Sequence, residues 1–454
     1  MKKIKFSVDT LGCKVNLSES DFIIRELQKR GMDHVPCSEN PDFCIINTCT
    51  VTSQSDRKAR QIIRRIKSKN KNSKIIVTGC FVVFNKEFLK ENGIGYVVEN
   101  NDKNKIPDLI EKIAAKKKRP RKVGEERIYK NGLDPYKYSS LIGRIHSRPL
   151  IKIQDGCEQN CSYCIVPKVR GKYRSVPHGE ILDKVKALQE DGFEEVVLTG
   201  IHIGKYGMDF KRNDQDTGIK TGNLADLLER IISDSDIKRI RISSIEVGEI
   251  DDRLLDVLKG NTGRFARHLH IPLQSGSNRI LELMGRPYSS EYYSDKIKMI
   301  GSIFPDIALA TDVMVGFPGE SEEDFRKTVE IIKKIAFSKI HVFKFSGRKH
   351  TPAYWMRDQV DEEVKSQRSK IIRNIGDELR SDYLKRNIGK VLDVVCEEID
   401  IGNNMANGTS DNYIKVYFQI DKEDFPLLRG RIVKVNIDSE YRNGLRGAIK
   451  LGIQ

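Results

Sequence analysis

The 454-residue sequence lacks any apolar run that approaches the ~20 residues needed to span a bilayer. Lys2 and Lys3 are basic, but no apolar segment of the kind found in signal peptides follows them. We therefore expect a cytoplasmic protein with no membrane partner. Because that compartment keeps thiols reduced, the nine cysteines are not expected to form a disulfide framework, and any clustered subset predicts metal or redox chemistry.

Acidic residues are absent from residues 57–74, which contain nine lysines or arginines. Residues 112–148 contain twelve basic residues against three acidic ones. Such segments attract polyanions, nucleic acid first among them, although a solvated helix face and a linker are the simpler interpretation. A helix in the first segment would present its basic side chains outward, because one stripe is apolar and consists of Ala59, Ile62, Ile63 and Ile66.

The pattern of apolar segments predicts a multidomain α/β protein. Strands alternate with helices over residues 1–114, which indicates a Rossmann-like parallel α/β domain, and a basic linker follows at 115–148. Six strand–helix units over 149–386 predict a partial (β/α)6 barrel, in which function lies at the carboxyl ends of the strands. Four short alternating strands over 387–454 predict a small β-barrel, whose near-neutral charge does not by itself indicate RNA binding.

Three cysteines, Cys157, Cys161 and Cys164, follow the first predicted barrel strand. Thiolates select zinc or iron–sulfur clusters, and both a structural zinc site and a cubane cluster normally take four protein ligands. Three clustered cysteines would leave one iron open for a substrate or cofactor. The alternative is a zinc site completed by His178, in a zinc-stabilised RNA-binding protein without catalysis.

A second set, Cys13, Cys49 and Cys80, occupies the carboxyl ends of three predicted parallel strands. Those ends lie side by side at one edge of a sheet, so the three thiols are expected to converge. Chance placement in the core is the alternative, and it would leave the set at 157–164 as the single metal site. The other cysteines share no pattern and are expected to be ordinary buried or partly buried residues; they are Cys37, Cys44 and Cys396.

The spacing of Cys157, Cys161 and Cys164, with Tyr163 before the last cysteine, resembles the radical S-adenosylmethionine superfamily. The resemblance implies that the open iron binds the amino and carboxylate groups of S-adenosylmethionine. It also implies reductive cleavage of that cofactor to methionine and a 5′-deoxyadenosyl radical.

Both cysteine sets together, with the terminal barrel, resemble the methylthiotransferases over essentially the whole chain. That resemblance implies two [4Fe–4S] clusters held by the six cysteines, the first-domain cluster handling the inserted sulfur, and conversion of C–H to C–S–CH₃ on a base. The terminal barrel resembles the TRAM module, which contacts RNA in related enzymes. Further matching segments lie at 241–247, 270–277, 311–320 and 351–353.

The segment TLGCKVN at residues 10–16 is similar to the branch that acts on N6-threonylcarbamoyladenosine at tRNA position 37. The alternatives are the isopentenyladenosine branch and the branch that modifies a ribosomal protein, and the basic segments favour tRNA over a partner that is itself basic. The implied partners are the tRNA anticodon stem-loop, an electron-donor protein such as a flavodoxin or ferredoxin, and a sulfur source. A polar insert at 211–223 departs from the family pattern.

Four other residues are candidates for cofactor binding because they lie in the cluster loop or at strand ends: Tyr163, Gly200, Glu246 and Gln274. By the resemblance, Tyr163 would pack on the adenine, or simply within its loop. Gly200 would let the backbone approach the methionine amino group. Glu246 and Gln274 would reach the cofactor or the base, or make ordinary hydrogen bonds at the barrel rim.

Two glycines and two arginines complete the candidates. Gly316 and Gly319 flank a Phe-Pro pair and predict a tight turn, with cofactor contact as a secondary role. Arg170 and Arg174 follow the cluster loop and are expected either to bind phosphate or to lie on the surface.

Overall fold

The computed structural model describes residues 3–115, 147–210, 222–400 and 402–450. Most of the predicted basic linker and of the polar insert lies outside these residues. The chain divides into two compact units. The first unit combines the N-terminal domain with Asp155–Gln159 and Cys164–Lys172, and the second unit contains the remaining described residues. No helix of the described segments is long and apolar enough to cross a membrane.

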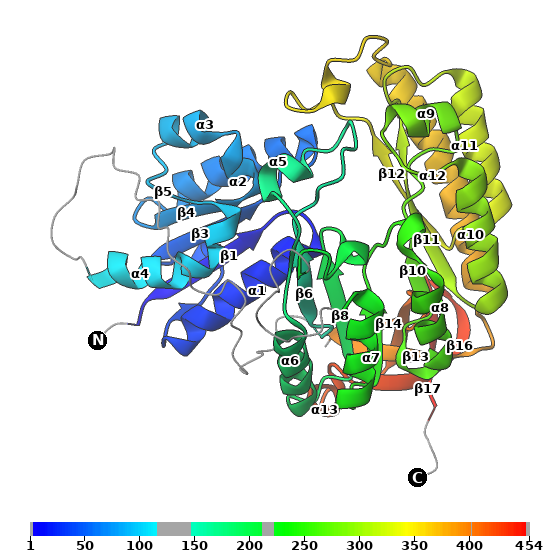
Figure 1. The fold of residues 1–454 in the computed structure, drawn as a ribbon. Helices are drawn as coiled ribbons and strands as arrows, with labels where there is room; N and C mark the ends of the chain where they lie inside the picture. The colour runs from blue at the N-terminus through cyan, green and yellow to red at the C-terminus, as the bar shows by residue number, and fades with distance from the viewer. Residues whose placement is uncertain (1–2, 116–146, 211–221, 401, 451–454) are drawn as a thin grey trace. The chain divides into compact units, whose positions relative to one another are not determined.

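The first unit is built on a five-stranded parallel sheet in the doubly wound order β2-β1-β3-β4-β5, which confirms the predicted Rossmann-like domain (Figure 1). Its strands are β1 (Lys5–Thr10), β2 (Asp33–His34), β3 (Phe43–Thr48), β4 (Lys74–Gly79) and β5 (Tyr96–Val98). Its helices are α1 (Lys14–Lys29), α2 (Ser53–Lys69), α3 (Lys86–Glu91), α4 (Ile106–Ala115) and α5 (Val166–Arg170).

Helix α2 packs as its periodicity predicts. Strand β3 is buried along its whole length, so both faces of the sheet need cover. Ala59, Ile63 and Ile66 are buried against β3 and β4, and Ile62 packs at the edge of the same cluster. Helix α1 begins directly after Cys13, and no side chain caps its first turn.

All six predicted strands of the barrel-like domain are present, which confirms the partial (β/α)6 architecture. Together with one additional short strand, β7, they form two sheets, in the orders β7-β6-β8-β9 and β10-β11-β12. The strands are β6 (Leu150–Asp155), β7 (Arg174–Ser175), β8 (Glu195–Gly200), β9 (Arg239–Ile242), β10 (His268–His270), β11 (Ala308–Val315) and β12 (Lys339–Lys344). The short strand β7 was not predicted.

Helices alternate with these strands, as expected for strand–helix units. Asn223 and Ser321 begin two of them with capping boxes, and Asp251 and Ser289 cap two others, which explains why their starts were visible in the sequence. The helices are α6 (His178–Glu190), α7 (Leu224–Asp234), α8 (Asp252–Gly260), α9 (Asn278–Leu283), α10 (Ser290–Ile303), α11 (Glu322–Ile335) and α12 (Glu362–Lys385).

The C-terminal strands form a closed barrel in the order β13-β14-β15-β17-β16, which confirms the predicted small β-barrel. The elements are β13 (Val391–Asp400), β14 (Met405–Ser410), β15 (Lys415–Gln419), α13 (Phe425–Leu428), β16 (Ile432–Tyr441) and β17 (Gly444–Ile449). The prediction of four strands was wrong, because β14 has the sequence MANGTS, which is typical of a turn.

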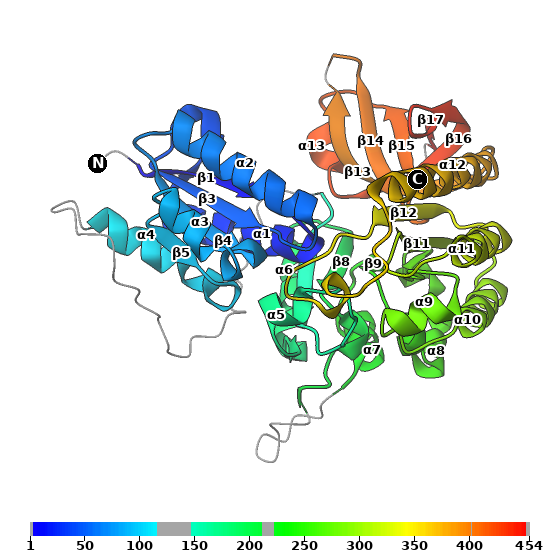
Figure 2. The same cartoon turned by 90° about the horizontal axis from the view of Figure 1, so that it is seen from above.

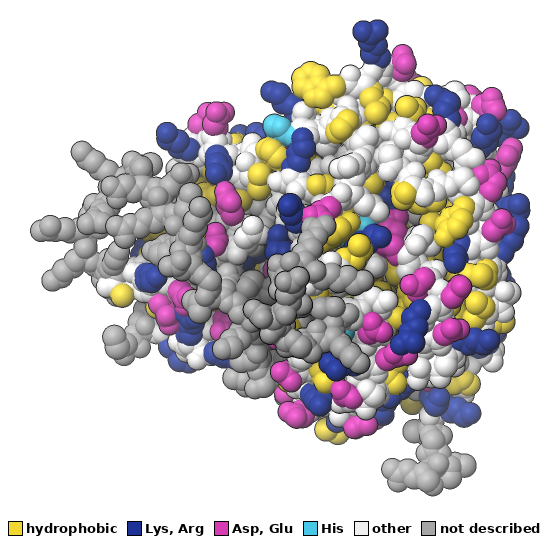
Figure 3. All heavy atoms as spheres, in the orientation of Figure 1, with side chains coloured by type: hydrophobic (Ala, Val, Ile, Leu, Met, Phe, Trp, Pro, Cys, Tyr) yellow, Lys and Arg dark blue, Asp and Glu magenta, His cyan; other side chains and the backbone are white. Residues whose placement is uncertain are grey.

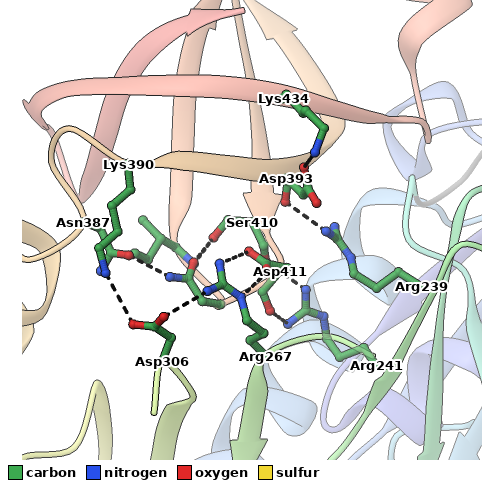
Figure 4. A network of polar contacts seen from close by, with 12 residues as sticks. Arg239, Arg241, Arg267, Asp306, Asn387, Lys390, Asp393, Ser410, Asp411 and Lys434 are labelled. Carbon is green, nitrogen blue, oxygen red and sulfur yellow. Dashed lines mark hydrogen bonds and ion pairs between the residues drawn. The ribbon is translucent and has the colours of Figure 1, made fainter. Parts of the chain in front are cut away.

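Helix α12 connects the barrel to the rest of the second unit (Figure 2). Its residues Tyr383 and Leu384 pack into the barrel core together with Ala308 of β11. A polar network joins the barrel to β9 and to the residue before β10 (Figure 4): Arg241 of β9 donates to the backbone oxygen of Ser410 (2.9 Å), and Arg267 pairs with Asp411 (2.5 Å).

Candidate metal centres

The first-domain cysteines lie directly after three neighbouring strands. Cys49 and Cys80 are the first residues after β3 and β4, and Cys13 follows β1 by three residues. Burial raises the pKa of the Cys49 thiol, and the nearby Cys80 and Cys13 raise it further. The structure therefore brings the three thiols within electrostatic range of one another, as expected for the carboxyl ends of adjacent parallel strands.

Two glycines let the cysteine loops approach each other. Gly12 has φ +114, and a Cβ there would lie 3.2 Å from the Cys49 sulfur. Gly79 has φ +101, and a Cβ there would overlap the Thr48 backbone. Neither position accepts a side chain without strain, so the Gly-Cys pairs at 12–13 and 79–80 are a local signal for the site.

Asn16 ties two of these loops together, although sequence reasoning did not single it out. Its amide donates to the backbone oxygens of Leu11 (2.6 Å) and Thr48 (3.1 Å). Asn47 donates in turn to the Asn16 backbone oxygen (2.9 Å). The Asn of TLGCKVN thus fixes the turn that holds Cys13 relative to the turn that holds Cys49.

The prediction for Arg170, phosphate binding or surface exposure, was wrong. The residue is buried in the first unit, where it pairs with Glu19 (3.0 Å) and Asp155 (2.9 Å) and donates to Asn16 (2.5 Å). Two carboxylates offset the cost of burying the guanidinium. Burial opposes the charged form, but Asp155 and Glu19 more than compensate and hold the pKa of Arg170 well above its ordinary value. Arg174, on β7, is half-buried.

The donor chemistry of the first cysteine set fits an iron–sulfur cluster. Three neighbouring thiols repel one another as thiolates, and a bound metal removes that penalty because thiolate is its ligand form. Soft sulfur donors select zinc, copper(I) or iron–sulfur centres. Within the described segments, no three cysteine, histidine, aspartate or glutamate side chains are already gathered in a closed ligand set.

The cysteines of the second set belong to different units. Cys157 and Cys164 belong to the first unit and are half-buried, and Cys161 belongs to the second and is buried. The Cys157 amide donates to the Gly171 oxygen (2.9 Å), and a side chain at Gly156 (φ +75) would overlap the Lys172 backbone. In the second unit, a guanidinium nitrogen of Arg286 lies 3.4 Å from the Cys161 sulfur.

Tyr163 and Gly200 have packing roles in the second unit. The Tyr163 ring lies edge-on to Phe317, at a centroid distance of 6.5 Å, in a cluster with Met284. A Cβ at Gly200 would lie 2.7 Å from an Ile203 methyl group, so the end of β8 requires glycine whatever else approaches it. The contacts are those expected from loop packing, and cofactor binding by these two residues stays a prediction.

Glu246 and Gln274 are held by protein contacts. Arg286 donates to the Glu246 carboxylate. Burial raises the pKa of Glu246 above its ordinary value, and Arg286 offsets only part of that rise. Gln274 has φ +64, a strained conformation for a residue other than glycine, and its backbone N–H donates to the backbone oxygen of Asp312 (2.9 Å). Sequence reasoning identified Glu246 but missed Arg286, the residue that joins it to Cys161.

The remaining candidates have plain structural roles. Gly316 and Gly319 have φ of +72 and +80, which confirms the predicted tight turn. His178 begins α6 and stacks on Tyr206, with ring centroids 5.5 Å apart. Of the three cysteines outside both sets, two are buried and one is half-buried, as expected; they are Cys44, Cys396 and Cys37.

One polar cluster near the end of β8 was not predicted. His202 pairs with Glu249 (2.5 Å), and the His202 amide donates to the Gln154 side chain (2.7 Å). These residues are buried or nearly so; Gln154 lies in β6, and His202 and Glu249 lie in the connections that follow β8 and β9. No local sequence signal marks them, because they are far apart along the chain.

Known proteins resemble this chain over nearly its full length. Sequence profiles match at residues 151–332 for the Radical SAM superfamily and at 5–99 for the Uncharacterized protein family UPF0004. Threonylcarbamoyladenosine tRNA methylthiotransferase MtaB of Bacillus subtilis is 38% identical over 436 residues, covering 94% of this chain and 92% of that protein. The protein of the same name from Aquifex aeolicus is 35% identical, covering 94% of this chain and 99% of that protein.

Two further proteins resemble this chain at lower sequence identity. The tRNA-2-methylthio-N(6)-dimethylallyladenosine synthase of Campylobacter jejuni is 31% identical, covering 99% of this chain and all of that protein (100%). Among solved structures, the radical S-adenosylmethionine methyltransferase TsrM from Kitasatospora setae superposes with a TM-score of 0.55 at 15% identity, covering 78% of this chain and 77% of that one. At that identity the superposition shows a shared fold.

Proposed function

This chain belongs to the radical S-adenosylmethionine methylthiotransferase family, and on that premise we propose that it modifies tRNA, converting N6-threonylcarbamoyladenosine at position 37 to its 2-methylthio derivative. The observation that most supports sulfur insertion is the placement of Cys13, Cys49 and Cys80 just after three adjacent parallel strands. The choice of nucleoside is supported by the TLGCKVN segment and by the names of the relatives that are 35% and 38% identical.

The enzyme uses S-adenosylmethionine and two [4Fe–4S] clusters, and its six cysteines are the residues that would hold the clusters. A cluster with an open iron, when bound, supplies the electron that cleaves S-adenosylmethionine. Cys157, Cys161 and Cys164 would leave one iron open in this way.

The first-domain site is closed on one side and open on the other. Cys49 and Cys80 are buried, whereas Cys13 is exposed at the start of α1. The two buried thiols would keep water from most of the ligand set. The exposed Cys13 would mark the open side of the site, from which sulfur would be delivered and then passed to the base.

The reaction also needs an electron donor and a source of sulfur. We propose a flavodoxin or a ferredoxin as donor, because clusters of this type have low reduction potentials and need a donor of similar potential. We also propose that the enzyme works in the cytoplasm, where tRNA is found and where its nine cysteines stay reduced.

The exposed face of α2 is the proposed contact for the tRNA backbone. All seven of its basic side chains are exposed: Arg57, Lys58, Arg60, Arg64, Arg65, Lys67 and Lys69. Among the ion pairs of the described residues, this face makes one, between Arg65 and Asp9 at 4.0 Å. Positive charge that carboxylates do not neutralise is available for phosphates.

Changing Arg57, Lys58 and Lys69 together to glutamine is expected to weaken tRNA binding in a salt-dependent way. If each contacts a phosphate, the slope of log K against log salt becomes shallower by about 0.7–0.9 per residue, about 2–3 in total. Binding titrations of the anticodon stem-loop between low and moderate salt measure both the affinity and the slope.

The matched control removes three positive charges elsewhere. Lys298, Arg326 and Lys327 lie on α10 and α11, where each pairs with an acidic side chain. Figure 3 shows basic and acidic side chains intermixed over these helices. Glutamine at these three positions is expected to leave the salt slope unchanged, and equal losses in the two triple variants would contradict a role for α2.

Deleting the gene tests the proposed function directly. The 2-methylthio-N6-threonylcarbamoyladenosine peak is expected to disappear from tRNA nucleosides measured by mass spectrometry, and the unmethylthiolated nucleoside should accumulate. Expression of the wild-type chain should restore the peak. Loss of the methylthio-isopentenyl nucleoside alone would instead assign the enzyme to the other tRNA branch of the family.

A further inference from the structure

Arg286 is a buried cation beside one of the proposed cluster ligands. Its side chain is 2% exposed, and one terminal nitrogen donates to the Cys161 sulfur at 3.4 Å. The other terminal nitrogen pairs with the Glu246 carboxylate, and Nε lies 3.2 Å from the Tyr288 hydroxyl. All these residues belong to the second unit.

The backbone around Arg286 is fastened to the loop that contains Cys161. The Ser162 amide donates to the Met284 oxygen (2.9 Å), and the Ser162 hydroxyl donates to the Leu283 oxygen (2.7 Å). Gly285 has φ +70, and a Cβ there would lie 2.9 Å from the Asn160 oxygen. The end of α9 and the cysteine loop are therefore in close contact on both sides of Cys161.

The guanidinium itself is also held in place. Its carbon lies 5.0 Å from the centre of the Tyr288 ring, and the Tyr288 hydroxyl donates to the oxygens of Pro272 and Leu273, both at 3.1 Å. Glu246 fixes the second nitrogen of the fork. An arginine held from three directions cannot turn away from the Cys161 sulfur at low cost.

We propose that Arg286 is a positioning residue of the S-adenosylmethionine-cleaving centre, where it orients Cys161 and raises the reduction potential of the cluster that Cys161 would bind. The inference rests on the proposed function, because it takes Cys161 as a ligand. Hydrogen bonds to ligand sulfurs and nearby positive charge favour the reduced, more negative state of an iron–sulfur cluster. Arg286 supplies both the donor and the positive charge at the Cys161 sulfur, and Glu246 holds the guanidinium there through its other terminal nitrogen.

The test uses the full chain with Cys13, Cys49 and Cys80 changed to alanine, so that a single cluster is observed. Arg286→Met removes the charge and the donor, and Arg286→Gln removes the charge and keeps a donor. Both are expected to shift the midpoint potential to more negative values, Met more than Gln, in titrations followed by electron paramagnetic resonance.

Arg368→Met is the matched control, because Arg368 is also buried in the second unit, where it pairs with Glu320 at 2.8 Å. It should leave the potential unchanged. Loss of iron from a folded Arg286 variant, with iron retained in the control, would support the positioning role. An unchanged potential in the Arg286 variants would overturn the proposal.

Two other outcomes have distinct meanings. Loss of the fold in both Arg286 variants, seen by circular dichroism, would overturn the proposal and reduce Arg286 to a structural ion pair. If the chain with alanine at positions 13, 49 and 80 and with Arg286 intact binds no iron, the assignment of Cys157, Cys161 and Cys164 as ligands fails, and the proposed function fails with it.

Discussion

Replacing Cys49 by alanine is expected to abolish methylthiolation while S-adenosylmethionine is still cleaved. Cys49 is the central member of the first-domain set, since burial and both neighbouring thiols act on it. Loss of a ligand should cost more than the 10–100-fold that loss of an outer-shell contact costs, so product formation should fall by more than about 100-fold. Iron and sulfide should drop from about eight to about four per chain.

Cys44→Ala is the matched control for this experiment. Cys44 lies on β3, the strand that Cys49 follows, and is fully buried, but it is outside the proposed ligand set. It should keep its iron, its cleavage of S-adenosylmethionine and its methylthiolated product. Undiminished product in Cys49→Ala would show that the enzyme works with one cluster, and loss of cofactor cleavage as well would show that the substitution damages more than the first-domain site.

The placement of the first-domain cysteines was predictable because it follows from topology. Once strands and helices alternate, the sheet is parallel, and residues just after the strands must meet at one edge. Cys13, Cys49 and Cys80 needed no further information. The apolar stripe of α2 was equally predictable, because a period of 3.6 residues determines which side chains are buried.

The buried arginines could not be predicted in the same way. Arg170 contacts Glu19, 151 residues earlier in the chain, and Arg286 contacts Cys161 over a separation of 125 residues. Periodicity and spacing describe neighbours along a helix or a strand and contain no information on such pairs. Arg170, which follows the cysteine loop, was therefore expected to bind phosphate or lie on the surface, although Glu19 and Asp155 stabilise its burial.

Strand β14 shows the same limit in the barrel. Its sequence contains Asn407 and Gly408, which local propensity assigns to a turn. Pairing with β13 on one side and β15 on the other makes it a strand. Gly408 is required there, because a Cβ would overlap the Val395 backbone of β13.

Glu195→Ala is expected to be the most destabilising single change in the second unit. Glu195 is fully buried on β8 and accepts hydrogen bonds from Arg239 and from Arg241 (2.8 Å). The same arginines donate to barrel oxygens, Arg239 to that of Asp393 (2.9 Å) and Arg241 to that of Asp411 (3.2 Å). Removing the carboxylate leaves two buried cations unpaired, which costs about 3–5 kcal/mol of unfolding free energy.

Urea unfolding of the wild type and of Glu195→Ala measures this difference, with Glu330→Ala as control. Glu330 pairs with Arg326 on the exposed surface of α11, and its loss should change stability by less than about 1 kcal/mol. An effect of Glu195→Ala as small as that of the control would mean that Arg239 and Arg241 are satisfied by barrel oxygens alone.

The pH dependence gives a second measurement of the same carboxylate. Burial raises the pKa of Glu195, but Arg239 and Arg241 outweigh it and lower the pKa from 4.5 to about 2. Since the folded-state pKa is depressed, the stabilisation is fully present above about pH 4.5 and is lost as the pH falls toward 2. The stability difference between wild type and Glu195→Ala should therefore shrink over that interval, because the wild type loses there what the variant lacks at every pH.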